Sequence, residues 1–588
     1  MSRHLSGLSA LTSPFSEAVH GLACAYRHLA TGYQLAILAT ILAAFALSDY
    51  WGLWAIEAGA LVILFYLRLD LSLLLIAFCI PFACSYKHLG RAVFSPTEMV
   101  TLAAALAWLI RLVWGRWLPT PPAEARKASL SSPHIPTPPA EARKASLSSP
   151  HIPTPPAEAR KASLSSPYIP PPPAEARKAS LSSPHIPTPP AEARKASLSS
   201  PHWAMLAFVA AHLLSLRVAA DLEAGLWQLR TAVLEPFLLY LLVRSQGRNR
   251  KTLVALGDAL VLGAVAVAAI GLYQFFFTDY VESVEGVRRI LSVFDSPNHL
   301  SLFLGRAVPV AACVALWGGT RWRRLAHGVA LLPLLLCLYL TFSRGAWLLG
   351  LPASLLCIGW LRGRKGMLIA LGVIAGLLLA LLPFVHTARL ASLTTLQEGT
   401  TSFLRLLLWM GTWRMIRGHP LWGVGSGNFV SQYPRYMLPE AWREPVVYHP
   451  HNLVLETWAM LGVPGLIALA WLMVALFRGG LVLYRRLASQ RDLQALILGL
   501  LAGMADMLAH GLVDTGYFLA DLAFVLMLTA GIIQTAGASS PPGQSPQEGS
   551  RGCNEQSGAQ PTRPLGGSQH HPCQQQPGSY HRPHQPVH

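Results

Sequence analysis

Residues 252–277 read TLVALGDALVLGAVAVAAIGLYQFFF, a run of 26 residues in which Asp258 is the one charged side chain. About 20 apolar residues cross the hydrocarbon of a bilayer as a helix, and a helix satisfies its own backbone hydrogen bonds there. Similar apolar runs lie near 34–47, 52–67, 71–84, 97–114, 203–218, 226–243, 299–318, 325–342, 346–361, 367–385, 452–477, 494–512 and 518–536. Together the runs predict an all-α polytopic membrane protein with about 12–14 transmembrane helices. The number is a range because the runs near 34–47, 52–67 and 71–84 are short and can form fewer full spans.

The composition of the 588 residues excludes several classes of protein. The chain is 53% hydrophobic and 13% charged, and its mean hydropathy is +0.41, which is too apolar for a soluble cytosolic enzyme. The net charge of +18 is scattered among the apolar runs and does not form one basic face, so we expect no nucleic-acid partner. The eight cysteines include no CxxC pair and predict neither a disulfide framework nor a zinc site.

The basic loops between the runs predict the orientation of the chain. Short loops rich in Lys and Arg stay on the cytoplasmic side, and four such loops occur: Arg244, Arg248, Arg250 and Lys251; Arg321, Arg323 and Arg324; Arg362, Arg364 and Lys365; and Arg478, Arg485, Arg486 and Arg491. Both termini are then cytoplasmic, while residues 278–298, the turn at Ser343–Arg344 and the long segment 386–451 are exterior.

This topology divides the chain into segments. We expect a cytoplasmic N-terminus (1–33), N-terminal transmembrane helices (34–118), a transmembrane core (203–385), one large exterior loop (386–451) and C-terminal transmembrane helices (452–536). No small-residue cleavage pattern precedes the first apolar run, which predicts a retained start of the membrane domain, with a signal anchor as the alternative.

Two segments are predicted to be disordered. Residues 119–202 repeat a 17-residue unit, PPAEARKASLSSPHIPT, whose prolines and lack of apolar surface oppose a stable fold. We interpret it as a cytoplasmic linker; the alternative is a basic-Ser kinase site or a tether to anionic lipid. The polar tail, 537–588, is rich in Gln, Pro, Gly, Ser and His.

One motif begins where the exterior loop enters a helix. His451-Asn452 is followed by nine residues, Gly462, two residues and Gly465. The pattern places an imidazole at the exterior start of a helix and two glycines further along it, where they permit close approach of a neighbouring helix. The alternative is an interfacial histidine above an ordinary pair of packing glycines.

With further motifs, the sequence resembles the O-antigen ligase and polymerase family of bacterial envelope glycosyltransferases. The resemblance covers roughly 226–535, and the 17-residue repeats have no counterpart in it. It rests on the His-Asn pattern, Phe342–Trp347 (FSRGAW), Arg405 ahead of Trp409 and Trp413, Pro420–Phe429 (PLWGVGSGNF), and His510 with Asp514. It implies a multi-pass protein of the bacterial inner membrane that transfers a glycan from a polyprenyl diphosphate at the periplasmic face, without a metal or cofactor.

The residue types suit such a donor. A diphosphate requires cations, and the topology puts Arg344 and Arg405 at the exterior level, where a guanidinium can bind phosphate through two hydrogen bonds. Either arginine can instead be a snorkelling interfacial side chain. His451 is the candidate base for the acceptor hydroxyl, with His449 as the rival. Direct displacement inverts the anomeric centre, and no nucleophilic carboxylate stands beside the motif.

Further residues are weaker candidates. Glu456 either orients His451 or is a buried polar group, and Arg306 is expected to face the interior near the donor diphosphate. His510 and Asp514, four residues apart, either pair structurally or line the acceptor cavity. Asn298 is expected to cap a helix. The substrate-binding set is Asn452, Arg306, His449, Arg414, Glu456, His510 and Asp514, with Gly425, Gly462 and Gly465 as structural positions.

The motifs leave the acceptor open among a lipid A core, a second lipid-linked glycan and a protein hydroxyl. A solute transporter predicts broken spans in corresponding positions of two halves, a symmetry absent from this sequence. A scaffold predicts that the repeats, and not the exterior residues, are essential.

Overall fold

The computed structural model describes residues 21–114, 201–381, 400–441 and 446–538, apart from 22, 49, 90, 91, 248 and 285. These residues are mainly helical, and all lie in one compact unit, 1–541. The helices are α2 (Thr31–Leu47), α3 (Trp51–Leu67), α4 (Leu69–Cys79), α5 (Pro96–Trp114), α8 (Pro201–Ser215), α9 (Leu222–Leu229), α10 (Glu235–Gln246), α11 (Arg250–Phe277), α12 (Pro297–Trp317), α13 (Arg321–Leu340), α14 (Leu351–Leu361), α15 (Gly363–Leu381), α17 (Thr401–Gly418), α18 (Phe429–Gln432), α19 (Leu453–Arg486), α20 (Arg491–His510) and α21 (Ala520–Ala538).

Shorter elements connect these helices. Two antiparallel hairpins pair β1 (Lys87–Leu89) with β2 (Ala92–Phe94) and β3 (Glu282–Val284) with β4 (Val287–Arg289). The 3-10 turns are η1 (Ile80–Phe82), η5 (Leu216–Val218), η9 (Tyr433–Arg435) and η10 (Pro439–Ala441), and the π-helical turns are η6 (Arg230–Leu234) and η7 (Ala346–Gly350).

The prediction of an all-α polytopic membrane protein is confirmed. Within the described ranges, nine helices are long and apolar enough to cross a membrane, and four shorter apolar helices cover Thr31–Phe45, Gly52–Leu67, Leu69–Phe82 and Ala346–Leu361. The helices follow the predicted runs closely: the run at 252–277 becomes α11, Arg250–Phe277. The repeats, apart from their last two residues, and the tail beyond 538 lie outside the described residues.

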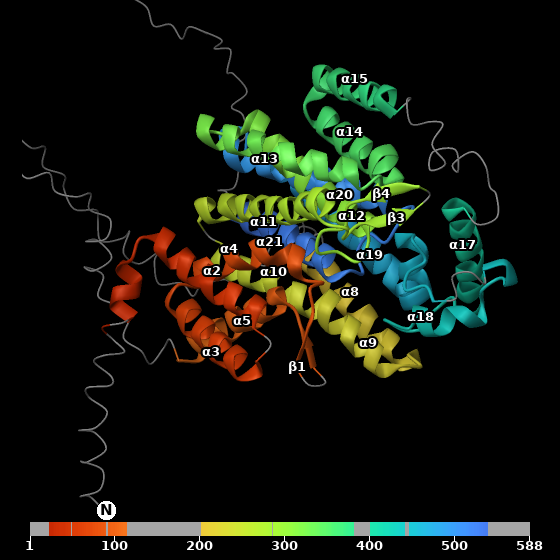
Figure 1. Cartoon of the computed structure of the whole chain (residues 1–588), viewed down its shortest axis with the longest axis horizontal. Coiled ribbons are helices and arrows are strands. Elements are labelled where there is room, and N and C mark those ends of the chain that lie inside the picture. Colours follow the sequence, from red (N-terminus) through yellow and green to blue (C-terminus); the bar gives the residue numbers. More distant parts are fainter. Residues whose placement is uncertain are drawn as a thin grey trace, which may run out of the picture. The chain divides into compact units, whose positions relative to one another are not determined.

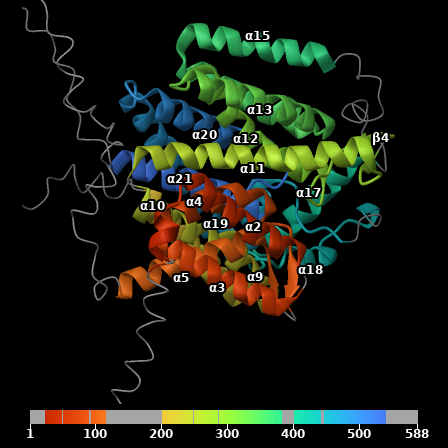
Figure 2. The same cartoon turned by 60° about the vertical axis from the view of Figure 1, so that its left-hand side comes forward.

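The core of the helix bundle is built on α12, which packs along both α13 and α20 (Figures 1 and 2). Glycines make the α12–α20 approach close: a Cβ at Gly499 would lie 2.5 Å from the Cα of Val310, and one at Gly503 would lie 3.0 Å from the carbonyl of Arg306. Small residues of this kind let membrane helices pack backbone to backbone. Elsewhere α10 packs on α21, and α19 on α8.

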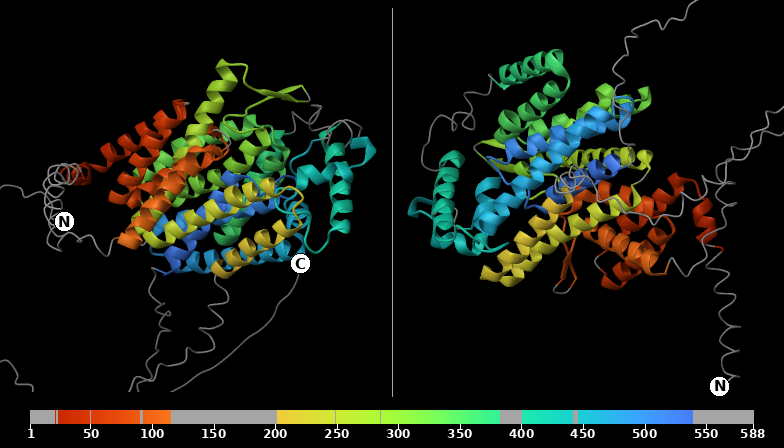
Figure 3. Two further views of the ribbon diagram at one scale, coloured as in Figure 1. Left: turned by 90° about the horizontal axis from the view of Figure 1, so that it is seen from below. Right: turned by 180° about the vertical axis from the view of Figure 1, so that it is seen from behind.

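Several predicted exterior segments gather at one end of this bundle. The β3–β4 hairpin, α17 and α18 lie together at that end, on the right in Figure 1, and the further views agree (Figure 3). The nearby start of α12 is capped by the hydroxyl of Ser296, which accepts a hydrogen bond from the backbone N–H of His299. The expectation that Asn298 caps this helix is wrong, because its side-chain oxygen instead accepts a 2.6 Å hydrogen bond from Arg289.

Helix α19 is broken at Gly462, which has a φ of +67°. Pro464 has no N–H to give to the carbonyl of Met460, four residues earlier. That carbonyl instead accepts a 3.1 Å hydrogen bond from the N–H of Gly425, and the carbonyl of Ala459 accepts one of 2.8 Å from Val424. The break therefore anchors the glycine-containing loop 423–427 to the side of α19.

Candidate active site

A cavity of about 310 Å³ opens at the end of the bundle where the predicted exterior segments meet. Its walls come from the β3–β4 hairpin, the start of α12, the turn after α13, α17 and the segments before α19 and after α20. Its acidic, basic and imidazole lining residues are Glu282, Arg289, Arg344, Arg405, His451 and Asp514. The three segments that the topology placed outside the membrane thus all contribute to one cavity. Its lining residues run from Glu282 to Asp514, more than 200 positions apart in the chain.

The centre of the cavity is a hydrogen-bonded chain of three side chains. His451 Nδ1 lies 2.7 Å from Asp514 Oδ1, and Arg405 Nη2 donates to Asp514 Oδ2 at 3.1 Å. Burial favours the neutral acid, but His451 and Arg405 outweigh it and hold the pKa of the Asp514 carboxyl well below its usual range. Because a carboxylate can only accept, Nδ1 of His451 carries the proton, and in a neutral ring Nε2 has the free lone pair.

The backbone around His451 is held in an uncommon conformation. Its φ is +49°, a left-handed value that non-glycine residues rarely adopt. On one side, the indole N–H of Trp409 donates to the carbonyl of Pro450 at 2.9 Å. On the other, Leu453 N–H donates to the carbonyl of Gly511 at 2.7 Å. These contacts fix His451 between α17 and the turn that bears Asp514.

Asn452 completes this attachment as the N-cap of α19. Its side-chain oxygen accepts hydrogen bonds from the N–H groups of Val454 and Leu455, each at 3.0 Å, and its amide donates to the carbonyl of Leu512 at 2.8 Å. Asn452 does not line the cavity. The structure therefore gives this predicted substrate ligand a positioning role.

His449, the rival base, is engaged elsewhere. Its Nδ1 lies 2.5 Å from Glu456 Oε1, and the other oxygen of Glu456 accepts a 2.6 Å hydrogen bond from Thr515. Burial opposes protonation of the imidazole, but the neighbouring Glu456 and Asp514 carboxylates raise the pKa of His449 above its usual value. Neither His449 nor Glu456 lines the cavity. Of the two alternatives for Glu456, the buried polar group agrees with the structure. Glu456 orients His449, and the residue that orients His451 is Asp514.

Arg344 reaches the cavity from the turn after α13. Its Nη2 donates to the hydroxyl of Thr401 at 2.6 Å. Phe342, two residues before Arg344, has a φ of +47°, and the π-helical turn η7 begins two residues after Arg344. Such irregular backbone is common at functional sites and here separates α13 from α14.

The sequence analysis missed a third arginine, Arg289 on β4. It is 4% exposed and lines the cavity. Its guanidinium is held by Glu282 at 2.8 Å and Asn298 at 2.6 Å, and it donates to the carbonyl of Thr341 at 2.8 Å. The available signal was a pair of adjacent arginines, Arg288 and Arg289, inside a loop that the topology had placed outside.

Three other candidates do not reach the cavity. Arg306 is buried in α12 and donates to the carbonyls of Leu302 and Gly516, so the expectation that it lies near a donor in this cavity is not met. Arg414 is exposed on α17 outside the cavity. His510 is buried against Gly345, and among the described residues neither ring nitrogen has a hydrogen-bond partner. The expected His510–Asp514 hydrogen-bonded pair is therefore not formed.

The glycines of the motif serve backbone contacts between loop and helix. A Cβ at Gly462 would lie 2.0 Å from the carbonyl oxygen of Leu421, and one at Gly425 would lie 2.6 Å from the Cα of Ala219. The expectation that Gly462 admits a neighbouring helix is wrong, since its close neighbour is the loop before Gly423. For Gly465, the nearest atom is the Cβ of Leu461 in its own helix.

Comparison with known families bears on this cavity directly. Residues 329–470 match the family described as O-antigen ligase. This segment is similar to the O-antigen ligase family. It includes Arg344, Arg405 and His451, whereas Asp514 and Arg289 come from parts of the chain on either side of it. No curated protein matches the chain significantly.

The O-antigen ligase match confirms the resemblance seen in the sequence and supports a membrane enzyme of polysaccharide biosynthesis. The matched segment is shorter than the 226–535 over which the sequence resemblance extends. In the described part of the chain, one group of side chains has ligand atoms close enough together to hold a metal, namely Cys84, His299 and Asp521. None of the three lines the cavity.

Proposed function

We propose that this protein transfers a glycan from a polyprenyl diphosphate to an acceptor hydroxyl at the periplasmic face of the bacterial inner membrane. The observation that carries the proposal is the meeting of Arg344, Arg405 and the His451–Asp514 pair in one cavity. The family supplies the class of reaction, and the cavity supplies the cations and the base that this reaction uses.

The arginines bind the donor. Arg344 and Arg405 bind the diphosphate, and the buried Arg289 adds positive charge to the same wall. Their charge also stabilises the lipid diphosphate as it leaves, because negative charge grows on it as the bond to the anomeric carbon breaks.

His451 acts as the general base. Its Nε2 removes the proton of the acceptor hydroxyl while the hydroxyl oxygen bonds to the anomeric carbon, and the products are the glycosylated acceptor, the lipid diphosphate and a protonated imidazole. Asp514 stabilises that imidazolium and holds the ring in the required tautomer. A single displacement inverts the anomeric centre and, on this account, requires no metal or cofactor.

The test is glycan transfer from a lipid-linked donor in membranes, with equal amounts of each variant. His451→Asn is the informative base variant, because Asn tolerates a left-handed backbone and lacks a base. We expect it to lower transfer about 100-fold or more, the usual contribution of a general base. His419, which binds Tyr436 outside the cavity, provides the control His419→Asn.

The cation assignment has its own matched pair. Arg405→Ala is expected to lower transfer strongly, whereas Arg417→Ala, on the same helix and exposed outside the cavity, is expected to retain it. Normal transfer by His451→Asn or Arg405→Ala would overturn the assigned roles. The labelled product identifies the acceptor as a lipid A core, a second lipid-linked glycan or a protein hydroxyl.

A further inference from the structure

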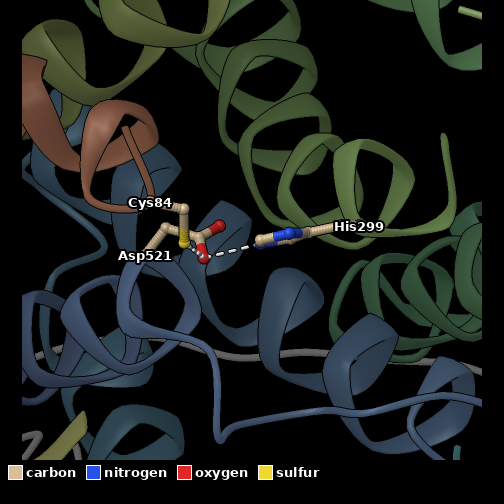
Figure 4. Close-up of side chains that lie close together, drawn as sticks. All are labelled: Cys84, His299 and Asp521. Carbon is tan, nitrogen blue, oxygen red and sulfur yellow. Dashed lines mark hydrogen bonds and ion pairs between the residues drawn. The ribbon is translucent and has the colours of Figure 1, made fainter. Parts of the chain in front are cut away.

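Three side chains from distant segments meet in the interior beside the start of α12. Cys84 follows η1, His299 lies in the first turn of α12, and Asp521 lies in the first turn of α21. Figure 4 shows the imidazole pointing at the carboxylate of Asp521 and the thiol lying against the same carboxylate. Their ligand atoms all lie within 4.8 Å of one another.

The spacing suits a small tetrahedral metal ion. His299 Nε2 lies 2.8 Å from Asp521 Oδ1, and Cys84 Sγ lies 3.6 Å from the same oxygen. In a tetrahedral zinc site, metal–ligand bonds of about 2.0–2.3 Å put neighbouring ligand atoms roughly 3.3–3.8 Å apart. Small side-chain movements bring the three ligand atoms to that separation.

The chemistry of the group also points to a cation. Asp521 is fully buried and His299 is 4% exposed, and the second carboxylate oxygen of Asp521 has no hydrogen-bond partner among the described residues. A buried carboxylate with an oxygen that lacks a partner is costly, and a metal ion bound to this carboxylate would offset its negative charge. Thiolate, imidazole and carboxylate together are ligands that zinc accepts.

We propose that Cys84, His299 and Asp521 bind one zinc ion, with water as the fourth ligand. Binding releases the thiol proton and joins the N-terminal segment to α12 and α21. Ser296 and Asn298, just before His299, line the cavity, so the ion would fix one wall of it. The proposal goes beyond the proposed function, since no step of glycan transfer passes through the ion.

The test is the metal content and the cobalt spectrum of the purified full-length protein. We expect about one zinc per chain and, after exchange for Co²⁺, a near-ultraviolet thiolate-to-cobalt charge-transfer band. Cys84→Ser should abolish that band. Cys553→Ser with Cys573→Ser should retain it, which separates the site from the Cys- and His-containing tail.

A second measurement does not depend on the spectrum. A chelator should lower the thermal midpoint of the wild type, and added zinc should restore it, because a ligand that binds the folded state stabilises it. Cys84→Ser and His299→Gln should show no such response. Absence of the cobalt band in the wild type, or its persistence in Cys84→Ser, would overturn the proposal and leave a hydrogen-bonded His299–Asp521 pair.

Discussion

At the scale of single residues, two histidines two positions apart have separate partners. His451 is bound to Asp514 and lines the cavity, whereas His449 is bound to Glu456 and does not line it. Sequence reasoning found both histidines but joined Asp514 to His510, because residues four apart share a helical face. Since α20 ends at His510, Asp514 lies in the following turn, where its carboxylate contacts His451 and Arg405 and not His510.

The raised pKa of His449 predicts a pH-dependent stability. A histidine with a folded-state pKa above its unfolded value of about 6.5 stabilises the fold fully below that value and loses this contribution as pH rises through the folded pKa. We expect the thermal midpoint to fall from pH 6 to pH 9, and Glu456→Gln to flatten this slope. Scanning calorimetry or fluorimetry in detergent measures it; an equal slope in the variant would refute the assignment.

Asp514 makes a distinct prediction for catalysis. Asp514→Asn keeps the shape but removes the charge that stabilises protonated His451, so we expect transfer to fall roughly 100-fold or more, the contribution expected of a general base. The KM for the lipid-linked donor should change much less than kcat, which initial-rate kinetics at several donor concentrations would show. A change confined to KM would instead indicate that Asp514 acts through Arg405 on donor binding.

At the scale of elements, helix α19 illustrates what hydropathy predicts and what it misses. The apolar run from 452 to 477 correctly predicts a helix there, yet nothing in its periodicity shows that it is broken at Gly462. Gly and Pro are common in membrane helices, so Gly462 and Pro464 alone do not predict a break. The break is explained by the segment Leu421–Gly425, which packs against Gly462 and binds the carbonyls that the break frees.

Gly462→Ala is therefore expected to be destabilising. The new Cβ would collide with the carbonyl of Leu421, and a left-handed φ costs a non-glycine residue about 1–3 kcal/mol. Gly376→Ala in α15 is the control: a Cβ there meets nothing within 4 Å, and alanine favours helix. Thermal midpoints of the two variants should move in opposite directions, and a Gly462→Ala midpoint at or above wild type would contradict this account.

At the scale of the whole molecule, the membrane helices follow from local composition, but the cavity does not. Positive-inside topology places 278–298, 343–344 and 386–451 on one side, and the structure brings residues from each into one cavity. Arg289 escaped prediction because its one signal, a pair of adjacent arginines in an exterior loop, belongs to no motif. Cys84, His299 and Asp521 escaped because their sequence separations exceed any local metal-binding spacing, which is why counting cysteines predicted no zinc site.

The 17-residue repeats give a prediction at this scale. Among the described residues, the walls of the cavity come from 282–298, 343–345, 401–451 and 514, and the 17-residue repeats supply none of the side chains to which a role in transfer is assigned. Deletion of 121–200 should therefore leave transfer per molecule within about twofold of wild type, which corresponds to roughly 0.5 kcal/mol, the size of effect expected of changes away from the site. Loss of transfer at normal membrane levels would favour the scaffold interpretation.

Exposed apolar side chains lie just before the loop 423–427 that α19 anchors. Leu421 and Trp422 are 62% and 48% exposed, and Trp413 on α17, 47% exposed, packs edge-on against Trp458 of α19. Tryptophans gather at the headgroup level of membranes. These side chains would then hold this end of the helix bundle at the headgroup level, where the proposed prenyl-anchored donor would arrive by lateral diffusion, at a rate that depends on its density in the leaflet.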